Sequence, residues 1–291
     1  MKWPAMGYAR VDSLDGLWRA LDAAGPEAQI LAGGQSLLAT LSFRLSEPSG
    51  LIDITRIASL KGIGVTEAAL RIGALTRHAD LARDPLVARH APLLAQAAPL
   101  IAHPAIRNRG TIGGSLALAD PAAELPACVV ALGATIVLAS RSGERRVAAS
   151  DFFKGLFTTD LEPGEIVVAV EVPVATAASR QTIVEVTRRS GDYAMAGLAA
   201  VLSIQADGGV ADCRLVFFGV GSGAEIAQAA SAALIGQQLS DASIAAAKAA
   251  LADDLDPPSD LHGGPELKRH LAGVLLARAL RPFLARSEQA A

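Results

Sequence analysis

The chain has 291 residues, a net charge of −3 and a pI near 6.0. Hydrophobic residues make up 51% and charged residues 19%, which is typical of a globular protein of one large or two ordinary domains and excludes a disordered chain. No basic stretch stands out, so the composition argues against a nucleic-acid partner.

The chain offers no segment suited to cross a membrane. Its longest apolar run, 127–139, contains Gly133 and is shorter than the roughly 18–20 residues that a spanning helix needs. The first residues lack the apolar centre of a secretory signal. We therefore expect a cytoplasmic protein without a membrane span.

The first block of predicted elements surrounds a pair of glycines. Ser13 is suited to cap the first helix, and Gly25-Pro26 ends it. The predicted elements are a helix at 13–24, a strand at 29–31, a helix from about 36 to 43 and a strand at 51–54.

The second block mixes strands and helices around another pair of glycines. Thr76 is expected to cap its first helix. The predicted elements are a strand at 70–74, helices at 76–83, 92–101 and 127–132, and strands at 135–139 and 165–172.

The third block follows a linker at 174–179. Its strands come before its helices, which predicts a small α+β domain, and Asp207-Gly208-Gly209 is a hairpin turn between its last two strands. The predicted strands lie near 181–188, 195–205 and 211–219, and the helices near 224–235, 240–253 and 264–286.

Two glycine segments, Ala32-Gly33-Gly34-Gln35-Ser36 and Thr111-Ile112-Gly113-Gly114-Ser115, are candidates for anion binding. Glycine leaves no side chain between the backbone and a ligand, and the N–H groups at a helix start attract phosphate. Two such segments facing each other would supply donors to a diphosphate. For either segment alone, an ordinary structural turn remains an alternative. Neither matches the dinucleotide fingerprint or the P-loop, which argues against those two folds.

The remaining residue types do not predict a metal site. Cys128 and Cys213 are far apart, and an ordinary [2Fe–2S] cluster needs about four thiolates, so the chain cannot hold such a cluster alone. The five histidines show no zinc-ligand spacing with cysteine. We expect the cysteines to be buried thiols.

Several stretches, read in order along nearly the whole chain, resemble the FAD-binding medium subunit of the xanthine dehydrogenase and carbon monoxide dehydrogenase family of molybdenum hydroxylases. The long second motif is the most specific of them. The stretches are LAGGQSL at 31–37, LIDI at 51–54, RNRGTIGGS at 107–115, DPAAELPA at 120–127, DFFKG at 151–155, the segment 165–173, EVTRRSGDYA at 185–194 and HLA at 270–272.

The resemblance implies an α+β fold: a vanillyl-alcohol-oxidase-type (PCMH-type) FAD-binding domain and a C-terminal α+β domain with a three-stranded antiparallel sheet and helices. We expect the FAD-binding domain at 1–176, with subdomains of about 1–57 and 58–176, and the C-terminal domain at 177–291. The implied cofactor is FAD. The implied partners are a large molybdopterin-binding subunit and a small subunit with two [2Fe–2S] clusters, assembled as a dimer of heterotrimers.

The resemblance also implies which residues contact the cofactor. The two glycine segments would bind the diphosphate and ribityl chain, while Ile101, Ala102 and Tyr193 would lie near the flavin. The region near Val168 would pack on the adenine or isoalloxazine. The full predicted set is Leu31, Ala32, Gly33, Gly34, Gln35, Ser36, Leu37, Ile101, Ala102, Thr111, Gly113, Gly114, Ser115, Glu124, Val168 and Tyr193.

Two positions depart from the family pattern. Glu124 would hydrogen-bond the ribityl or adenosine part, but relatives often have Asp there, and Leu118 stands where many have His. Asp120 and Glu124 could instead be a capping or surface pair. Tyr193 could be an ordinary half-buried aromatic residue.

Other polar residues of the second motif favour structural roles. His103 precedes Pro104 in a loop, and Arg107 and Arg109 are expected to hold the loop by bonding carbonyls in preference to neutralising phosphate. No residue stands out as a nucleophile or general base, so we assign no catalytic residue. The function that the resemblance implies is electron transfer from the partner's clusters through FAD to an external acceptor. A stand-alone FAD-dependent reductase of the same fold, or a scaffold subunit whose flavin site has decayed, are the alternatives.

Overall fold

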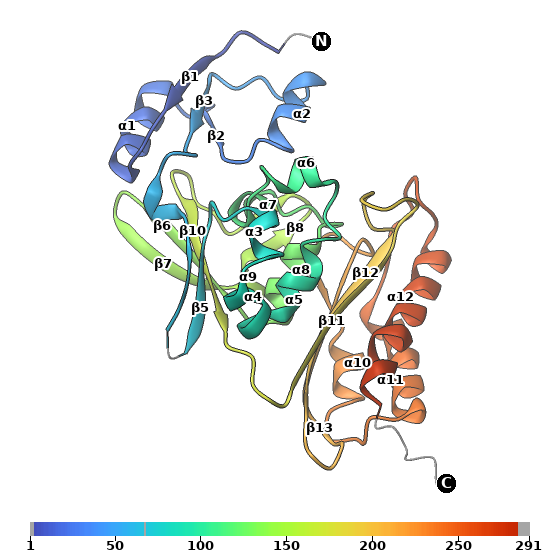
Figure 1. The fold of residues 1–291 in the computed structure, drawn as a ribbon. Helices are drawn as coiled ribbons and strands as arrows, with labels where there is room; N and C mark the ends of the chain where they lie inside the picture. The colour runs from blue at the N-terminus through green and yellow to red at the C-terminus, as the bar shows by residue number, and fades with distance from the viewer. Residues whose placement is uncertain (1–2, 67, 285–291) are drawn as a thin grey trace.

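The computed structural model describes residues 3–66 and 68–284, which form three connected units (Figure 1). The first unit, at the top of Figure 1, is a parallel sheet with strand order β1-β3-β2. Its elements are β1 (Gly7–Arg10), α1 (Leu14–Ala24), β2 (Gln29–Leu31), α2 (Leu37–Ser42) and β3 (Gly50–Asp53). The cap predicted at Ser13 is confirmed, because its hydroxyl oxygen accepts a hydrogen bond from Gly16 N–H at 3.2 Å.

Strand β1 was not predicted from the sequence, because all four of its residues are exposed and show no apolar alternation. A buried carboxylate holds it in place. Asp53 on β3 accepts hydrogen bonds from the Tyr8 hydroxyl at 2.6 Å and from Arg10 Nε at 2.8 Å. Although burial opposes ionisation, the hydrogen bonds from Thr55, Tyr8 and Arg10 lower the pKa of Asp53 to about 2. Asp53 therefore joins the first strand to the middle of this sheet.

The second unit is built on a five-stranded antiparallel sheet with order β4-β5-β10-β6-β7. Its strands are β4 (Ile63–Val65), β5 (Ala69–Gly73), β6 (Thr135–Ser140), β7 (Gly143–Ala148) and β10 (Ile166–Pro173). Residues alternate between the two faces of a strand. On β10, Val167 and Val170 face a core shared with the helices of this unit, whereas Ile166 and Val168 face a core shared with Leu17 of the first unit.

Short helices cover the first of those faces. They are α3 (His78–Leu81), α4 (Pro85–His90), α5 (Pro92–Ala97), α6 (Pro104–Arg107), α7 (Ile112–Leu118), α8 (Glu124–Ala131) and α9 (Ala149–Phe152), with a 3-10 turn at Ala58–Leu60 and the small strands β8 (Phe153–Gly155) and β9 (Thr158–Thr159) completing the unit. All eight residues of α8 are buried. Helix α8 therefore lies in the interior of the molecule, where it contacts strands β12 and β13 of the third unit.

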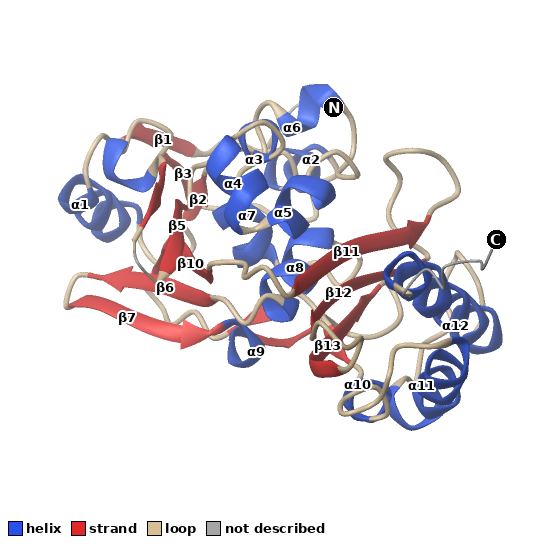
Figure 2. Cartoon of the chain, turned by 60° about the horizontal axis from the view of Figure 1, so that its bottom comes forward, coloured by secondary structure: helices blue, strands red, loops and turns tan. Residues whose placement is uncertain are grey.

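The third unit is an antiparallel sheet with order β11-β12-β13-β14. Its elements are β11 (Ser179–Val186), β12 (Ala196–Ile204), β13 (Val210–Phe218), β14 (Glu225–Ile226), α10 (Gln228–Ala232), α11 (Asp241–Asp254), α12 (Pro265–Leu280) and a closing 3-10 turn at Arg281–Phe283. Helices α10 and α12 pack on one face, and α5 and α8 pack on the other (Figure 2). The sheet is thus covered by helices on both sides.

Several sequence predictions need correction. The third sheet has a short fourth strand, β14, because residues 225–226 pair with β13, so the helix expected at 224–235 is confined to Gln228–Ala232. The helix expected at 76–83 is shorter, and its N-cap is Arg77, while the Thr76 hydroxyl donates to Gly62 O. The last helix ends at Leu280, and the predicted residues 285–286 lie outside the described part of the chain.

Within residues 3–66 and 68–284, no helix combines the length and the hydropathy that a membrane crossing requires.

Candidate functional site

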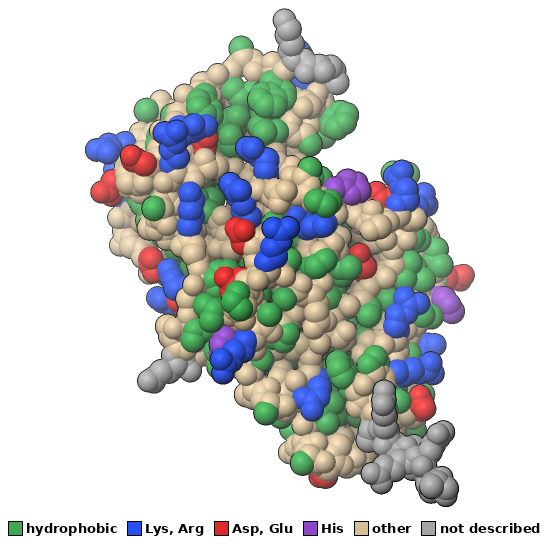
Figure 3. All heavy atoms as spheres, viewed as in Figure 1, with side chains coloured by type: hydrophobic (Ala, Val, Ile, Leu, Met, Phe, Trp, Pro, Cys, Tyr) green, Lys and Arg blue, Asp and Glu red, His purple; other side chains and the backbone are tan. Residues whose placement is uncertain are grey.

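A cavity of about 880 Å³ lies where the three units meet, a size that falls within the usual range of roughly 300–1,000 Å³ for ligand pockets. The space-filling view shows a notch between the first unit at the top and the third unit at the right (Figure 3). The lining comes from β2 and α2, from α6, α7 and the start of α8, from Leu161 and residues 165–167, and from the loop at 191–193. A ligand here would contact all three units.

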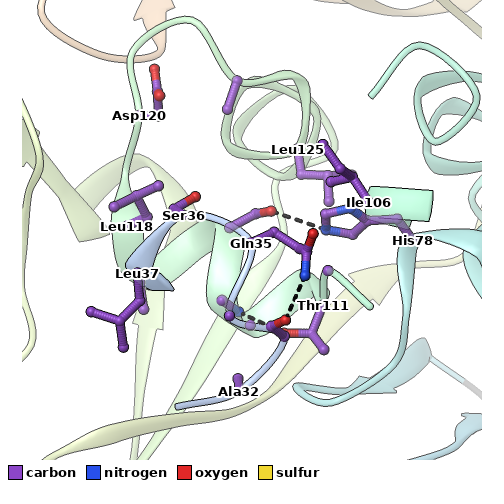
Figure 4. A pocket seen from close by; sticks show the side chains of 18 of the residues that line it. Ala32, Gln35, Ser36, Leu37, His78, Ile106, Thr111, Leu118, Asp120 and Leu125 are labelled. Carbon is purple, nitrogen blue, oxygen red and sulfur yellow. Dashed lines mark hydrogen bonds between the residues drawn. The ribbon is translucent and has the colours of Figure 1, made fainter. Parts of the chain in front are cut away.

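Both glycine segments contribute to the lining of this cavity (Figure 4). The first segment packs against Arg109 and Gly110, the two residues directly before the second segment. A Cβ added to Gly33 would overlap the carbonyl oxygen of Arg109 and lie 2.8 Å from the Cα of Gly110. Any side chain at position 33 would therefore push the segments apart. The missing side chain of Gly33 makes room for protein backbone, which differs from the sequence expectation that it makes room for a ligand.

The first segment presents unused hydrogen-bond donors. None of the five backbone N–H groups from Gly33 to Leu37 donates to another residue within the described ranges. The Gln35 amide turns back to donate to Gly33 O at 2.9 Å, and Ser36 is exposed. Ser36 makes no side-chain cap for α2, so its hydroxyl is left for a ligand. Consecutive free N–H groups of this kind suit anionic oxygens such as those of a diphosphate.

The second segment is different, because it is the first turn of a helix and the N–H groups of four of its residues, Ile112 to Ser115, already donate to protein oxygens. The N–H groups of Ile112 and Gly113 donate to Thr76 O at 3.0 Å and Ala74 O at 2.9 Å. Gly114 N–H donates to the Thr111 hydroxyl at 3.2 Å. The expectation that this segment forms a loop with amides open to a phosphate is therefore wrong. Helix α7 needs those bonds to join the five-stranded sheet.

The second segment can still offer a hydroxyl group. Ser115 Oγ lies 3.0 Å from His78 Nε2, and both residues line the cavity. Burial lowers the pKa of His78 to about 4, and nearby Arg107 adds to the effect. His78 is therefore neutral at pH 7 and holds Ser115 through a neutral hydrogen bond.

The residues expected near the flavin lie along one wall. Arg107 Nη1 donates to Ile101 O at 2.8 Å and to Ala102 O at 2.7 Å, and Ala102 has a left-handed φ of 42°. The guanidinium thus stabilises a backbone conformation that alanine rarely adopts. Tyr193 reaches the rim from the third unit and is 63% exposed, which leaves its ring free to pack on a ligand.

Two predicted residues do not line the cavity. Val168 is 4% exposed and lies in the core between the first two units, while its neighbours Ile166 and Val167 reach the cavity. Leu31 lies behind the first segment, with Cδ1 3.0 Å from where a Cβ on Gly34 would lie. The other fourteen predicted residues, Ala32, Gly33, Gly34, Gln35, Ser36, Leu37, Ile101, Ala102, Thr111, Gly113, Gly114, Ser115, Glu124 and Tyr193, all line it.

Acidic groups gather at one part of the cavity. Asp120 and Glu124 line it, and Asp120 Oδ1 accepts a hydrogen bond from Ala122 N–H at 2.9 Å. Glu124, the first residue of α8, is 8% exposed, and burial followed by the charges of Glu185 and Asp120 raises its pKa to about 7. Within the described residues, no group of three or more His, Cys, Asp or Glu side chains is arranged to hold a metal ion.

Two family models together match most of the chain. Residues 4–175 match the family model "FAD binding domain in molybdopterin dehydrogenase", and residues 181–283 match "CO dehydrogenase flavoprotein C-terminal domain". The chain therefore belongs to the FAD-binding medium subunits of the molybdenum hydroxylase family, as the sequence resemblance predicted. Its cofactor is FAD, and the predicted fold, a PCMH-type FAD-binding domain followed by a C-terminal α+β domain, is confirmed.

Individual relatives match at full length. The 6-hydroxypseudooxynicotine dehydrogenase complex subunit alpha of Paenarthrobacter nicotinovorans is 40% identical over 99% of this chain and 97% of its own. The carbon monoxide dehydrogenase medium chain of Hydrogenophaga pseudoflava is 36% identical over 97% and 98% of the two chains. A solved structure of that dehydrogenase superposes with a TM-score of 0.94 at 38% identity, over 98% of this chain and 100% of the other. Quinoline 2-oxidoreductase from Pseudomonas putida 86 gives 0.91 at 40% identity, over 97% and 98%.

The cavity fits this cofactor. Free amides and the Ser36 hydroxyl suit the diphosphate, and apolar side chains such as Ile101, Ile106 and Leu125 suit flat rings. Sequence reasoning missed His78, Gln29 and Ser46, which also line the cavity. No local pattern marks them, because each faces the cavity only after distant segments come together.

Proposed function

We propose that this chain is the electron-transfer subunit of a molybdenum hydroxylase complex. Electrons would reach its FAD from [2Fe–2S] clusters on a small partner subunit and leave to an external acceptor. Substrate would be oxidised on a large molybdopterin-binding subunit. Bound FAD supplies redox chemistry in one- or two-electron steps, and the protein places it and tunes it. The observation that carries the proposal is a cavity whose lining combines five backbone amides without a partner among the described residues and a set of apolar side chains.

The small number of cysteines supports the proposal that another subunit holds the iron–sulfur clusters. The chain has two cysteines, and both Cys128 and Cys213 are buried free thiols. Burial raises the pKa of Cys213 to about 12, with Asp212 adding to the effect, so its thiol stays protonated. Because iron–sulfur clusters are held by thiolates, such centres would have to come from another subunit.

The names of the relatives support an assembly with partners. The chain is similar to a complex subunit alpha, to a nicotine 6-hydroxylase medium subunit and to carbon monoxide dehydrogenase medium chains. Such names favour a subunit over a stand-alone reductase, and the free amides from Gly33 to Leu37 favour a working flavin site over a decayed scaffold. We propose a dimer of heterotrimers located in the cytoplasm.

The arrangement supports specific roles for the lining residues. Ala32 to Leu37 would hold the diphosphate, with Ser36 and Ser115 donating from their hydroxyls. Ile101, Ala102 and Tyr193 would contact the isoalloxazine, and Glu124 the ribityl or adenosine part. Thr111, Gly113 and Gly114 would form the wall behind the diphosphate. Leu31 and Val168 would act through packing, because neither reaches the cavity. The proposed domain boundary lies between residues 176 and 177.

Anaerobic reduction of the assembled complex tests the proposal. The complex, purified through this chain, should contain FAD, iron and molybdenum, and a substrate that reduces the molybdenum centre should bleach the flavin absorbance. The isolated chain with FAD should not be bleached by the same substrate, and the complex without its small subunit should not be either. Bleaching of the isolated chain would establish a stand-alone reductase and overturn the proposal.

A further inference from the structure

A buried lysine in the third unit has no part in the site described above. Within residues 3–66 and 68–284, Lys268 on α12 is the only lysine or arginine that is buried, with 2% of its surface exposed. It does not line the ligand cavity. Because a buried charge is unfavourable unless it is paired and hydrogen-bonded, the contacts of its ammonium group indicate what it stabilises.

The Lys268 ammonium group joins two loops of the third unit. Its Nζ donates to Asp260 Oδ2 and, at 2.9 Å, to the carbonyl oxygen of Gly219, which directly follows β13. Asp260 is itself held in place, because its Oδ1 accepts hydrogen bonds from His262 N–H at 2.8 Å and from Gly263 N–H at 3.2 Å. The ion pair therefore directs the ammonium group at Gly219.

Gly219 is bonded to one wall of the cavity. Its N–H donates to Pro121 O at 2.8 Å, a hydrogen bond that joins the third unit to the second. Pro121 lies between Asp120 and Glu124, and both acidic residues line the cavity. Through its carbonyl and its N–H, Gly219 thus links Lys268 to the segment 120–124.

Gly219 also packs closely against the loop that carries Tyr193. It has a left-handed φ of 75°, and a Cβ at this position would lie 2.6 Å from the carbonyl oxygen of Ala194. At the other end of the loop, a Cβ on Gly191 would lie 2.8 Å from the carbonyl oxygen of Ala102. The loop at 191–194 is therefore held between Gly219 and the wall expected to contact the flavin.

We propose that Lys268 is a positioning residue of the flavin site, which holds Gly219 and thereby fixes the segment 120–124 and the loop 191–194 around bound FAD. This inference rests on the proposed FAD site. Lys268 acts only through Gly219, since it does not reach the cavity. A binding site depends on the residues that support its contacting groups, and a looseness of about 1 Å in that support is enough to weaken it. The C-terminal domain would in this way contribute to FAD affinity through a residue remote from FAD.

Amide hydrogen exchange of the full-length apoprotein tests this arrangement without FAD. Lys268→Met keeps the length of the side chain but removes its charge and its donors. The N–H of Gly219 should then exchange about tenfold faster than in the wild type, and those of Ala122 and Met195, in the two cavity segments, should follow. The matched control is Arg269→Met, the next residue on α12, whose ion pair with Asp256 at 2.7 Å is exposed. It should leave these three amides unchanged.

Fluorescence titration with FAD gives the second readout. Lys268→Met should raise the Kd for FAD roughly 3- to 30-fold, whereas Arg269→Met should not change it. Asp260→Asn, which keeps the lysine but removes its counter-ion, should show the same pattern with smaller changes, so the test remains available if Lys268→Met does not fold.

A purely structural lysine would behave differently. Exchange would then rise evenly over β11, β12, β13 and α12, and the folded Lys268→Met and Asp260→Asn variants would bind FAD like the wild type. That result would overturn the inference while the proposed function stands. Failure of the wild type to bind FAD would instead refute the proposed function, and the inference with it.

Discussion

The two glycine segments have similar sequences but different roles in the structure. Each places two glycines beside hydroxyl residues at the start of a helix. From Gly33 to Leu37 the backbone N–H groups are unused by the described residues, whereas those of Ile112, Gly113 and Gly114 donate to protein oxygens. The first segment is therefore equipped to bind anionic oxygens, and the second builds the wall against which the first packs.

The comparison shows that a glycine in a cofactor-binding motif can be required for close packing within the protein. A Cβ on Gly113 would lie 2.5 Å from the Cβ of Ala74 and 2.8 Å from its carbonyl oxygen. Position 113 is thus restricted by Ala74, directly after β5, and position 33 by Arg109 and Gly110, directly before the second segment. The two segments should consequently respond differently to substitution.

The largest effect is expected at the second segment. Gly113→Ala should lower the free energy of unfolding by about 3 kcal/mol, because the new methyl group has no room against Ala74. Chemical denaturation of the apoprotein measures this. Gly64→Ala in β4, where a Cβ would meet nothing within 4 Å, is the control and should change stability little. Equal stability of the two variants would contradict the assignment of Gly113 to packing.

His78, which bonds Ser115 of the second segment, should also make the apoprotein sensitive to acid. The folded pKa of His78 is lowered to about 4, whereas an unfolded histidine has a pKa near 6.5. The unfolded state therefore binds a proton first, and stability from this group is lost as pH falls from about 6.5 to 4, by roughly 2–3 kcal/mol. Glu124 and Glu185, whose pKa values are raised, act in the opposite direction, so the effect is read as a difference between variants.

His78→Gln isolates that contribution. Its unfolding free energy relative to the wild type should rise as pH falls from 6.5 to 4, since glutamine does not titrate and can still bond Ser115. Parallel curves for His78→Gln and the wild type would show that the imidazole is not held neutral.

At the first segment, the effect should fall on cofactor affinity. Gly33→Ala should push Arg109 and Gly110 away and separate the segments, weakening FAD binding by about 10- to 100-fold, or about 1.4–2.8 kcal/mol. Fluorescence titration of the apoprotein with FAD measures the change. Retention of wild-type affinity would mean that contact between the segments does not shape the site.

The smallest effects should separate the two serines. Ser36→Ala should weaken FAD binding several-fold with unchanged apoprotein stability, because its hydroxyl makes no cap. Ser115→Ala should cost about 1 kcal/mol of apoprotein stability, since it leaves His78 Nε2 without its partner. Parallel measurements of affinity and unfolding check this contrast. A loss of stability in Ser36→Ala would remove the distinction.

Much of the architecture could be predicted from the sequence, because periodic apolar residues identify buried elements such as β10 and α1. Polar edge strands such as β1 and β7 could not be predicted. They are held by pairing with a neighbouring strand and not by burial of apolar side chains, so they lack an apolar pattern. Helix α4 does carry a local signal, because Asp84 is its N-cap and Pro85 its first residue.

For the site, the motifs identified most of the cavity wall, but they could not show which amides remain free. That depends on Ala74 and Thr76, which lie nearly forty positions before the helix that they bond. His78 was missed for the same reason. It enters the site through tertiary packing and belongs to no pattern with a fixed spacing.

Amide hydrogen exchange, followed residue by residue with and without FAD, tests the central claim most directly. In the apoprotein, the N–H groups from Gly33 to Leu37 should exchange rapidly, and those of Ile112 and Gly113 should already be protected. FAD should protect the first set by a large factor and change the second little. If FAD protected Ile112 and Gly113 alone, or left Gly33 to Leu37 unprotected, the division of roles between the two segments would be wrong.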